Sequence, residues 1–344
     1  MADLALDTAG MLDATLGLPD QIAAAVGTVG DLEGLPNPDR IRNVLVLGMG
    51  GSGIVGDLLS VVAGPYLPVP VLTIKGYEPP SYVDDHTLVF AVSFSGNTLE
   101  TLQAVETAHS AGAHIVAVTT GGELARRVSA WGQPVVRIDS TIPQPRAGIG
   151  AAAIPTLVVL EDLGLFRGAS EWIRLAVDQL RRRRDRLVLP NSPARVLARR
   201  LQGTFPLIWG GGGPGGLAAT RWKTQFNENT KLAAFASEVP EMCHNEIAGF
   251  GLHGDVTRQV FSVIQLRHDD EHPLVMTAFD VLTELVEEVV ADVHTVRAEG
   301  EGRLAQVLDL FLWGDLVSLF VAEEAGIDPG PVPALDAVKA RLRA

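Results

Sequence analysis

Residues 43–53 read NVLVLGMGGSG and decide the fold. They join a short apolar run of strand type, residues 43–47, to a glycine-rich turn. Apolar residues then return at helical spacing, at Ile54, Leu58 and Val62. A strand, a glycine turn and a helix in immediate succession are typical of the repeating unit of a parallel α/β sheet.

The same pattern recurs along the chain. Further strands are expected at residues 71–74, 88–92, 115–118 and 135–138, and after Pro190–Pro193 the pattern restarts with a strand at 205–209, a glycine-rich turn at 210–216 and a helix from Leu217. Later strands at 260–266 and 292–296 and two closing helices at 305–325 and 335–342 complete the series. Strands that alternate with helices predict doubly wound parallel sheets in three αβα layers, with ligands at the carboxyl ends of the strands.

The spacing of the two glycine-rich turns predicts a duplicated domain. They lie about 160 residues apart, more than the length of a typical single domain. We expect an N-terminal helical segment at residues 1–40, a first α/β domain at 41–185 and a second at 186–344.

Composition excludes several classes of function. The chain has 344 residues, 47% of them hydrophobic, and a net charge of -14, which argues against nucleic acid as a partner. The basic run Arg181–Arg184 is expected to be the solvated end of a helix. A single cysteine, Cys243, excludes a disulfide framework, and neither a signal peptide nor an uncharged apolar run of about 18 residues is visible. We therefore expect a cytoplasmic protein with no membrane partner.

The first glycine-rich turn matches the dinucleotide-binding fingerprint only in the spacing of its glycines. That fingerprint needs a carboxylate at the end of the second strand, and residues 73–76 read TIKG. Hydroxyls instead gather where strands give way to helices, at Ser52 and at Ser93, Ser95 and Thr98. Backbone N–H groups and hydroxyls with little positive charge suit a single phosphate monoester. The alternative is that these hydroxyls only cap helices.

Two clusters later in the chain suggest proton transfer. Residues 227–229 read NEN and residues 244–246 read HNE, so that a carboxylate between two carboxamides is followed by an imidazole. The alternative is a polar loop with a surface histidine. The other histidines are scattered, and His268 and His272 are expected in a solvated turn, so no metal site is predicted.

These motifs together resemble a known family. Residues 48–56 and 93–98 resemble a SIS domain, the sugar isomerase module. Residues 225–229 with Lys231, followed by residues 240–246 and Gly249, are similar to the bifunctional phosphoglucose/phosphomannose isomerase family. The resemblance implies two SIS domains and an aldose–ketose isomerase without metal or cofactor that acts on glucose 6-phosphate and fructose 6-phosphate. Mannose 6-phosphate stays an open alternative, because no Ser or Thr follows Ser318 in the tail.

The resemblance also implies roles for single residues. The sugar phosphate would be held by Gly51, Ser52, Ser93, Ser95 and Thr98. Glu228 would be the base that moves a proton between C1 and C2, Arg146 would stand beside the enediol, and His244 and Lys339 would assist ring opening. The family forms homodimers in which the histidine reaches the neighbouring subunit's site, and the apolar helix around Leu308–Val321 is a surface that a dimer could bury.

Two alternatives fall outside this interpretation. A SIS domain can serve as a non-enzymatic sugar-phosphate-binding regulator, which would keep the hydroxyl turns and lose the acid–base pair. An amidotransferase isomerase half would need an N-terminal cysteine nucleophile, which is absent, or a partner glutaminase.

Overall fold

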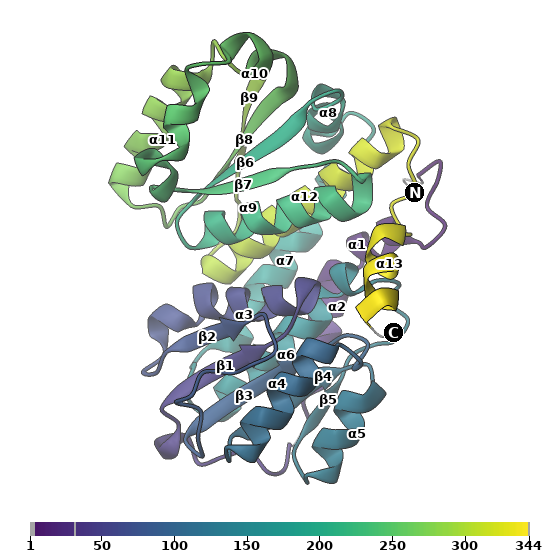
Figure 1. The fold of residues 1–344 in the computed structure, drawn as a ribbon, viewed down its shortest axis with the longest axis vertical. Helices are drawn as coiled ribbons and strands as arrows, with labels where there is room; N and C mark the ends of the chain where they lie inside the picture. Colours follow the sequence, from purple (N-terminus) through teal and green to yellow (C-terminus); the bar gives the residue numbers. More distant parts are fainter. Residues whose placement is uncertain (1–3, 31, 343–344) are drawn as a thin grey trace. The chain divides into compact units, whose positions relative to one another are not determined.

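The structure is a computed structural model that describes residues 4–30 and 32–342. The chain forms two compact units. The N-terminal unit is Gly17–Asp178, and the C-terminal unit combines Met1–Leu16 with Gln179–Ala344. Figure 1 shows that helices cover both sides of the sheet in each unit.

The N-terminal unit is built on a parallel sheet of order β2-β1-β3-β4-β5. Its strands are β1 Asn43–Leu47, β2 Val71–Ile74, β3 Thr87–Val92, β4 His114–Thr119 and β5 Val135–Arg137. Its helices are α2 Leu18–Val26, α3 Gly50–Val62, α4 Leu99–Ser110, α5 Gly122–Ala130 and α6 Ile149–Asp162, with short 3-10 turns at Pro38–Arg40, Gly64–Tyr66 and Pro145–Ala147.

The C-terminal unit repeats this topology with one strand fewer. Its sheet has the order β7-β6-β8-β9, again all parallel, with β6 Phe205–Gly211, β7 Phe235–Val239, β8 Phe261–Arg267 and β9 Asp292–Arg297. The helices are α1 Met11–Leu16, α8 Pro193–Arg200, α9 Pro214–Gln225, α10 Gly254–Val260, α11 Pro273–Val286, α12 Arg303–Glu324 and α13 Pro333–Leu342, with a π-turn at Phe226–Thr230 and 3-10 turns at Glu241–His244 and Glu246–Phe250. Helix α7, Ala169–Leu187, crosses from one unit into the other. The predicted duplication of a doubly wound α/β fold is confirmed.

Apolar strands form the centre of each sheet because helices cover both faces. In β3 every residue is buried, and side chains that alternate along β1 and β3 pack with α4 and α5 on one face. A strand covered on both faces reads as a continuous apolar run, which is why the sequence located the central strands. It did not locate β7, whose residues FASEV are mostly exposed at an edge of the sheet and lack that signal.

Three expectations about helices need correction. The segment 1–40 is not one helical unit: α1 and α2 are separated by Gly17 and lie in different compact units. Helix α12 offers no surface to a partner, because residues 304–322 are all buried within the described chain. It is the one described helix that is long and apolar enough to span a membrane, and its complete burial is that of a core helix.

The basic run Arg181–Arg184 is also not simply solvated. Arg183 is 6% exposed and forms an ion pair with Asp309 of α12, with Nη2 and Oδ2 separated by 3.0 Å. Its guanidinium also donates to the carbonyl of Arg297 and pairs with Glu299. A buried charge needs such a partner, and the one-dimensional pattern of α7 does not reveal it.

Candidate active site

The candidate phosphate site lies where the order of strands reverses in the N-terminal unit. From β1 the chain passes to β2 on one side and then to β3 on the other, so β1 and β3 are neighbours with Leu47 beside Ala91. Doubly wound sheets bind ligands in the crevice outside the carboxyl ends of such a pair. The glycine-rich turn follows β1 and the hydroxyl-rich loop follows β3, which brings the two predicted clusters to one edge.

A hydrogen bond joins the two loops. The backbone N–H of Phe94 donates to Ser52 Oγ at 3.2 Å, and Ser93 Oγ lies 2.9 Å from Thr98 Oγ1. Thr98 occupies the N-cap position of α4, yet its side chain makes no capping bond, and Ser52 lies inside α3. The alternative that Ser52 and Thr98 are only helix caps is therefore wrong. Because Ser52 accepts a bond from the loop, its own proton remains available for a ligand.

Backbone N–H groups add to these donors. Helices α3 and α4 both begin at this edge, and the first N–H groups of a helix have no partner within it. Those of Gly50 and Gly51 begin α3, while the N–H groups of Ser52 and Gly53 already bond the carbonyl of Met49. Two helix N-termini beside three hydroxyls are a candidate site for a phosphate group.

Polar groups from the next strand hold the loop after β3. Thr120 donates to the carbonyl of Phe94 from both its backbone N–H, at 3.0 Å, and its hydroxyl, at 2.7 Å. Asn97 Oδ1 accepts from the N–H of Glu123 at the start of α5, and Ser95 Oγ accepts from the N–H of Asn97. The sequence did not identify Thr120 or Asn97, because their roles depend on a loop distant in sequence. Phe94 contributes to this loop through its backbone N–H and carbonyl.

Gly96 is required by the close approach of that loop to β4. Its φ is +68°, and a Cβ at this position would lie 1.9 Å from the carbonyl oxygen of Gly121. No side chain fits there, and most residues avoid this backbone conformation. The tight turn keeps Ser95 and Thr98 at the start of α4.

Arg146 lies against the start of α3. It is 4% exposed, within the turn Pro145–Ala147, so the alternative of an exposed loop arginine is wrong. A Cβ at Gly51 would lie 3.4 Å from both the N and Cα atoms of Arg146, so the backbone of Arg146 lies directly against this glycine. The structure thus brings Arg146 to the glycine-rich turn that contains Ser52. A buried guanidinium there is a candidate for stabilising negative charge.

Glu228 lies in the C-terminal unit, in the π-turn Phe226–Thr230 that ends α9. Such π-turns are rare and occur frequently at functional sites. The turn is held by its neighbours: Asn229 Nδ2 donates to Ser318 Oγ of α12 at 2.9 Å, and Asn227 Nδ2 donates to the carbonyl of Leu232 at 2.9 Å. The two carboxamides that flank Glu228 therefore position its backbone.

Lys231 connects this turn to the tail of the chain. It is in the left-handed conformation with φ 60°, and its Nζ donates to the carbonyl of Glu228 at 2.7 Å. The same Nζ donates to the carbonyls of Asp328 at 3.0 Å and Pro329 at 3.3 Å. The tail that lacks Ser and Thr is thus attached to the turn that carries Glu228.

His244 ends a turn that follows β7. Met242 of this turn is 2% exposed and belongs to the core beneath α11, whereas His244 is exposed. Its ring makes no hydrogen bond or ion pair within residues 4–30 and 32–342. Burial raises the pKa of the neighbouring Cys243 thiol, which favours the inert, protonated form.

Glu228 and His244 of one chain lie at opposite ends of β7. Because β7 is parallel to β6, α9 runs back from the carboxyl end of β6 and leaves Glu228 at the amino end of the sheet. His244 follows the carboxyl end of β7. The five residues of β7 span roughly 13 to 16 Å. The structure does not bring the two predicted acid–base groups together within one chain.

The second glycine-rich turn does not resemble a phosphate site. His268 Nε2 lies 3.0 Å from the carbonyl oxygen of Gly211 and 3.2 Å from that of Gly212, so the ring donates to this turn. A Cβ at Gly216 would lie 2.9 Å from a carboxylate oxygen of Glu238, which places negative charge at the start of α9. His268 is 6% exposed, so the expectation of a solvated turn is wrong for this residue. His272 is exposed and caps α11.

Lys339 lies on α13, a helix with no buried residue among those described. Nothing in the described part of the C-terminal unit brings its amino group to Glu228 or to His244. Its assignment to ring opening stays a prediction.

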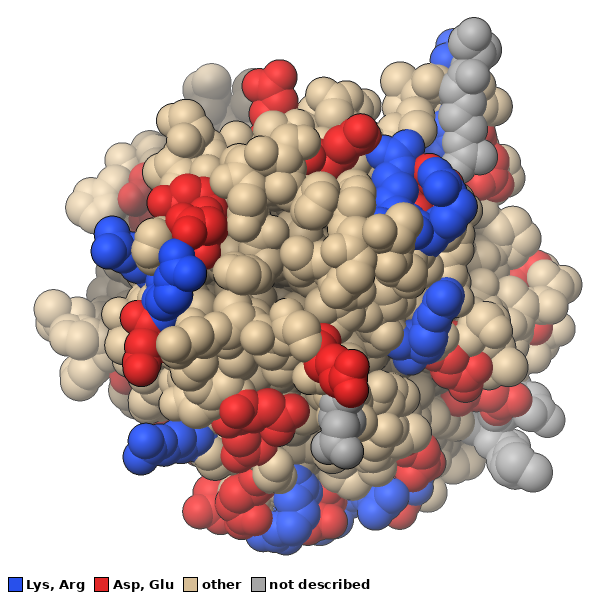
Figure 2. Space-filling model, turned by 90° about the horizontal axis from the view of Figure 1, so that it is seen from below, with Lys and Arg blue, Asp and Glu red and all other residues tan. Residues whose placement is uncertain are grey.

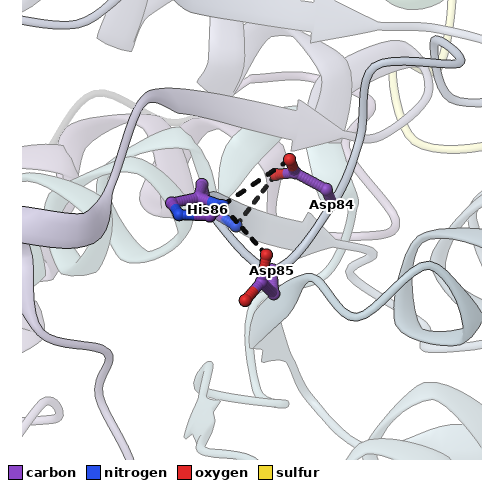
Figure 3. A group of neighbouring side chains, drawn as sticks. All are labelled: Asp84, Asp85 and His86. Carbon is purple, nitrogen blue, oxygen red and sulfur yellow. Dashed lines mark hydrogen bonds and ion pairs between the residues drawn. The ribbon is translucent and has the colours of Figure 1, made fainter.

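One group of side chains has the spacing of metal ligands. The ligand atoms of Asp84, Asp85 and His86 lie within 4.8 Å of one another (Figure 3). Asp84 Oδ1 accepts from the N–H of His86, and Asp85 pairs with Arg40 at 2.6 Å, so both carboxylates have structural partners. The group precedes β3 and lies at the amino end of the sheet, away from the candidate phosphate site. It carries no assignment as a metal site.

Charge on the surface agrees with the composition. On the face drawn in Figure 2, acidic and basic side chains are interspersed among uncharged ones. This face lacks the continuous basic surface that nucleic-acid binding requires.

The chain matches known protein families in both units. Residues 190–342 match the family described as bacterial phospho-glucose isomerase C-terminal SIS domain, and residues 40–131 match the SIS domain family. The chain is 35% identical over 337 residues to the bifunctional phosphoglucose/phosphomannose isomerase of Caldicellulosiruptor bescii, covering 96% of this chain and 98% of that protein. It is 30% identical over 304 residues to the protein of the same name in Aquifex aeolicus, covering 88% and 91%.

A solved structure shows the same fold. The crystal structure of a hypothetical protein from Thermus thermophilus superposes with a TM-score of 0.75 at 14% identity, covering 97% of this chain and 90% of that chain. At that identity the similarity concerns the fold alone.

Proposed function

Because the chain belongs to the bifunctional phosphoglucose/phosphomannose isomerase family, we propose that it interconverts glucose 6-phosphate and fructose 6-phosphate, and mannose 6-phosphate and fructose 6-phosphate. The relatives are enzymes and support an isomerase rather than a sugar-phosphate-binding regulator. What carries the proposal at the site is the Ser52–Phe94 hydrogen bond, which joins two hydroxyl-bearing loops at a switch point suited to one phosphate monoester.

The reaction moves one proton between two carbons of the open-chain sugar. From the open-chain aldose, the Glu228 carboxylate removes the proton from C2, the C–H electrons form a double bond between C1 and C2, the π electrons of the C1 carbonyl move onto O1, and a cis-enediolate forms. The protonated Glu228 then returns the proton to C1, while the C2 hydroxyl gives up its proton, O1 takes one up, and the C2 oxygen becomes the ketone. No electron acceptor is needed because the oxidation of C2 balances the reduction of C1.

The other residues hold the substrate and its developing charge. Ser52, Ser93, Ser95 and Thr98, with the N–H of Gly51, bind the phosphate in ground and transition states alike. Arg146 stabilises the negative charge that develops on the enediolate oxygen. Stabilisation of such developing charge is usually the largest single contribution to catalysis. His244 and Lys339 assist the opening of the pyranose ring by moving protons at the ring oxygen and the C1 hydroxyl.

We also assign His244 to the active site of a neighbouring subunit in a homodimer. This assignment is supported by the separation of Glu228 and His244 at the two ends of β7 and by the exposure of His244. A side chain that protrudes in this way can serve a second chain. The assignment is consistent with a cytoplasmic enzyme that acts on a small diffusible substrate.

A coupled assay tests the proposal. Formation of fructose 6-phosphate from glucose 6-phosphate and from mannose 6-phosphate should be followed separately with purified protein and a chelator. We expect turnover of both aldoses, and inactivity toward both would overturn the proposal. Turnover of mannose 6-phosphate is judged separately. It is the open alternative, because the tail held by Lys231 carries no Ser or Thr after Ser318. Turnover of glucose 6-phosphate alone would limit the enzyme to one aldose.

A further inference from the structure

An exposed apolar stripe runs along one flank of α11. Leu274 is 72% exposed, Val281 47% and Leu285 59%, and the partly buried Ala278, which packs against the core, lies between them. The spacing of four, three and four residues places these side chains within an arc of about 60°. The buried residues of α11 face a different direction, toward the core beneath β6 and β8. This stripe, residues 274, 278, 281 and 285, is called the α11 stripe below.

Acidic side chains accompany the α11 stripe. Asp280, Glu284, Glu287 and Glu288 lie on or directly after α11, and no basic residue occurs between Pro273 and Val286. Pairing two copies of α11 with each other would bring like charges together. An apolar stripe beside acidic groups fits a helix with apolar and basic groups.

Helix α13 has those properties. Leu335, Val338 and Leu342 are 42%, 56% and 57% exposed, at the spacing of three and four residues that forms one stripe. Lys339 and Arg341 lie on either side of this α13 stripe by the same helical geometry. Neither basic side chain forms a hydrogen bond or ion pair within the described residues. Among residues 4–30 and 32–342, therefore, no segment covers the apolar stripe of this amphipathic helix.

The two stripes are complementary in charge, and the α13 stripe is short enough to lie within the α11 stripe. The α13 stripe covers about 10 Å and the α11 stripe about 16 Å, at 1.5 Å per residue. Figure 1 shows α11 and α13 apart from each other in the C-terminal unit, and both stripes are exposed there. We propose that α13 of one subunit packs along α11 of a second copy of this chain, and that two such contacts related by a twofold axis hold the dimer.

This contact would bring two candidate site residues to one place. Ile247 and Phe250, just after His244, pack against the same core cluster as Phe279 and Leu282 of α11. A partner's α13, which carries Lys339, would therefore lie near His244. The inference rests on the proposed homodimer and names the surfaces that form it.

Polar substitutions in either stripe test the contact. Leu285→Glu and Val338→Glu change exposed side chains on different helices, so neither should disturb a core. We expect each to weaken dimerisation at least about 30-fold in sedimentation equilibrium, the effect of losing about 2 kcal/mol at a central apolar contact. Met276→Glu is the matched control on α11, since Met276 is 46% exposed and lies outside the stripe, and Ala337→Glu is the control on α13.

Cross-linking tests the pairing itself. In a Cys243→Ser background, a Val281→Cys chain mixed with a Val338→Cys chain should form a disulfide between the two chains. The same mixture with Met276→Cys in place of Val281→Cys should not. Charge reversal gives a second measurement. Glu284→Arg or Arg341→Glu alone should weaken dimerisation about 2- to 5-fold, and the two substitutions together should restore it.

The outcomes separate this inference from the proposed reaction. A wild-type monomer, or stripe variants that dimerise as tightly as the controls, would overturn the contact while turnover of glucose 6-phosphate is measured independently. A dimer that cross-links through the stripes but lacks isomerase activity would support the contact and overturn the function.

Discussion

Glu228 and His244 stand at opposite ends of β7, one in the π-turn before the strand and the other in the turn after it. Roughly 13 to 16 Å of strand separates them along the sheet. The strand thus holds the two groups apart within the C-terminal unit. This geometry is the physical argument for a site completed by a second subunit.

Mixing two inactive variants tests that argument. Glu228→Gln and His244→Ala proteins should each have little activity, and after subunit exchange a hybrid dimer contains one site with both groups intact. We expect the mixture to recover up to about a quarter of wild-type activity, since half of the dimers are hybrids with one working site of two. Absence of recovery despite exchange shown by mass measurement would place His244 in its own chain's site or give it a structural role.

Replacing the base by its amide should separate chemistry from binding. Glu228→Gln keeps the shape of the side chain but cannot accept a carbon-bound proton, so kcat should fall about a hundredfold or more with little change in KM. Loss of proton exchange between C2 and solvent deuterium, followed by NMR, would confirm which step is lost. Near-normal turnover would move the role to Glu241 or Glu246.

The hydroxyls of the phosphate site should affect binding more than turnover. The double variant Ser52→Ala with Thr98→Ala loses contacts made equally in ground and transition states, so KM for glucose 6-phosphate should rise about tenfold or more with a smaller change in kcat. Thr107→Ala, an exposed hydroxyl on the outer part of α4, is the control and should leave KM unchanged. An unaltered KM in the double variant would remove both hydroxyls from the phosphate site.

Gly96→Ala tests the tight loop between β3 and α4. An added Cβ would meet the Gly121 carbonyl at 1.9 Å and would also strain a backbone with φ +68°, so the loop must move. We expect KM for sugar phosphates to rise and thermal unfolding to occur several degrees lower. Gly132→Ala is a comparison, because its φ of +69° is similar but no atom lies within 4 Å of its Cβ position. Equal effects in both would assign the loss to backbone strain rather than to the close approach.

Stability should depend on the ionisation of Asp309. Burial raises the pKa of this carboxyl to about 6 from its ordinary 3.8, against the opposing effect of Arg183. A carboxyl whose pKa is higher in the folded state stabilises the fold below its unfolded pKa. That contribution is lost as the pH rises from about 4 to about 6, and its full size is about 3 kcal/mol at 1.36 kcal/mol per pKa unit.

The difference in unfolding free energy between wild type and Asp309→Asn isolates this contribution. Measured by urea denaturation from pH 4 to pH 8, wild type should lose stability relative to the variant as the pH rises from about 4 to about 6, and the difference should then level off. If this difference in unfolding free energy does not change with pH, the Arg183 ion pair cancels the effect of burial on the pKa of Asp309. If wild type instead gains stability relative to the variant as the pH rises, the ion pair outweighs burial.

Local pattern predicted the central part of the fold. Strands β1 and β3 are apolar along almost their whole length, and glycines must follow β1 where the chain turns into α3, so both signals are present within a few neighbouring residues. Strand β7 carries no such signal, because an edge strand has one neighbour and its side chains meet solvent. It exists through hydrogen bonds to β6, a segment more than twenty residues earlier.

By itself, the sequence determined the duplicated α/β architecture, the two hydroxyl-bearing loops and the motifs of residues 227–229 and 244–246. These depend on composition and spacing along the chain. Only the tertiary structure decided that α12 is entirely buried, that Arg183 and His268 are internal, and that Glu228 and His244 face opposite ends of one strand. Burial and the direction of a strand depend on which distant segments pack together, and no window of neighbouring residues contains that information.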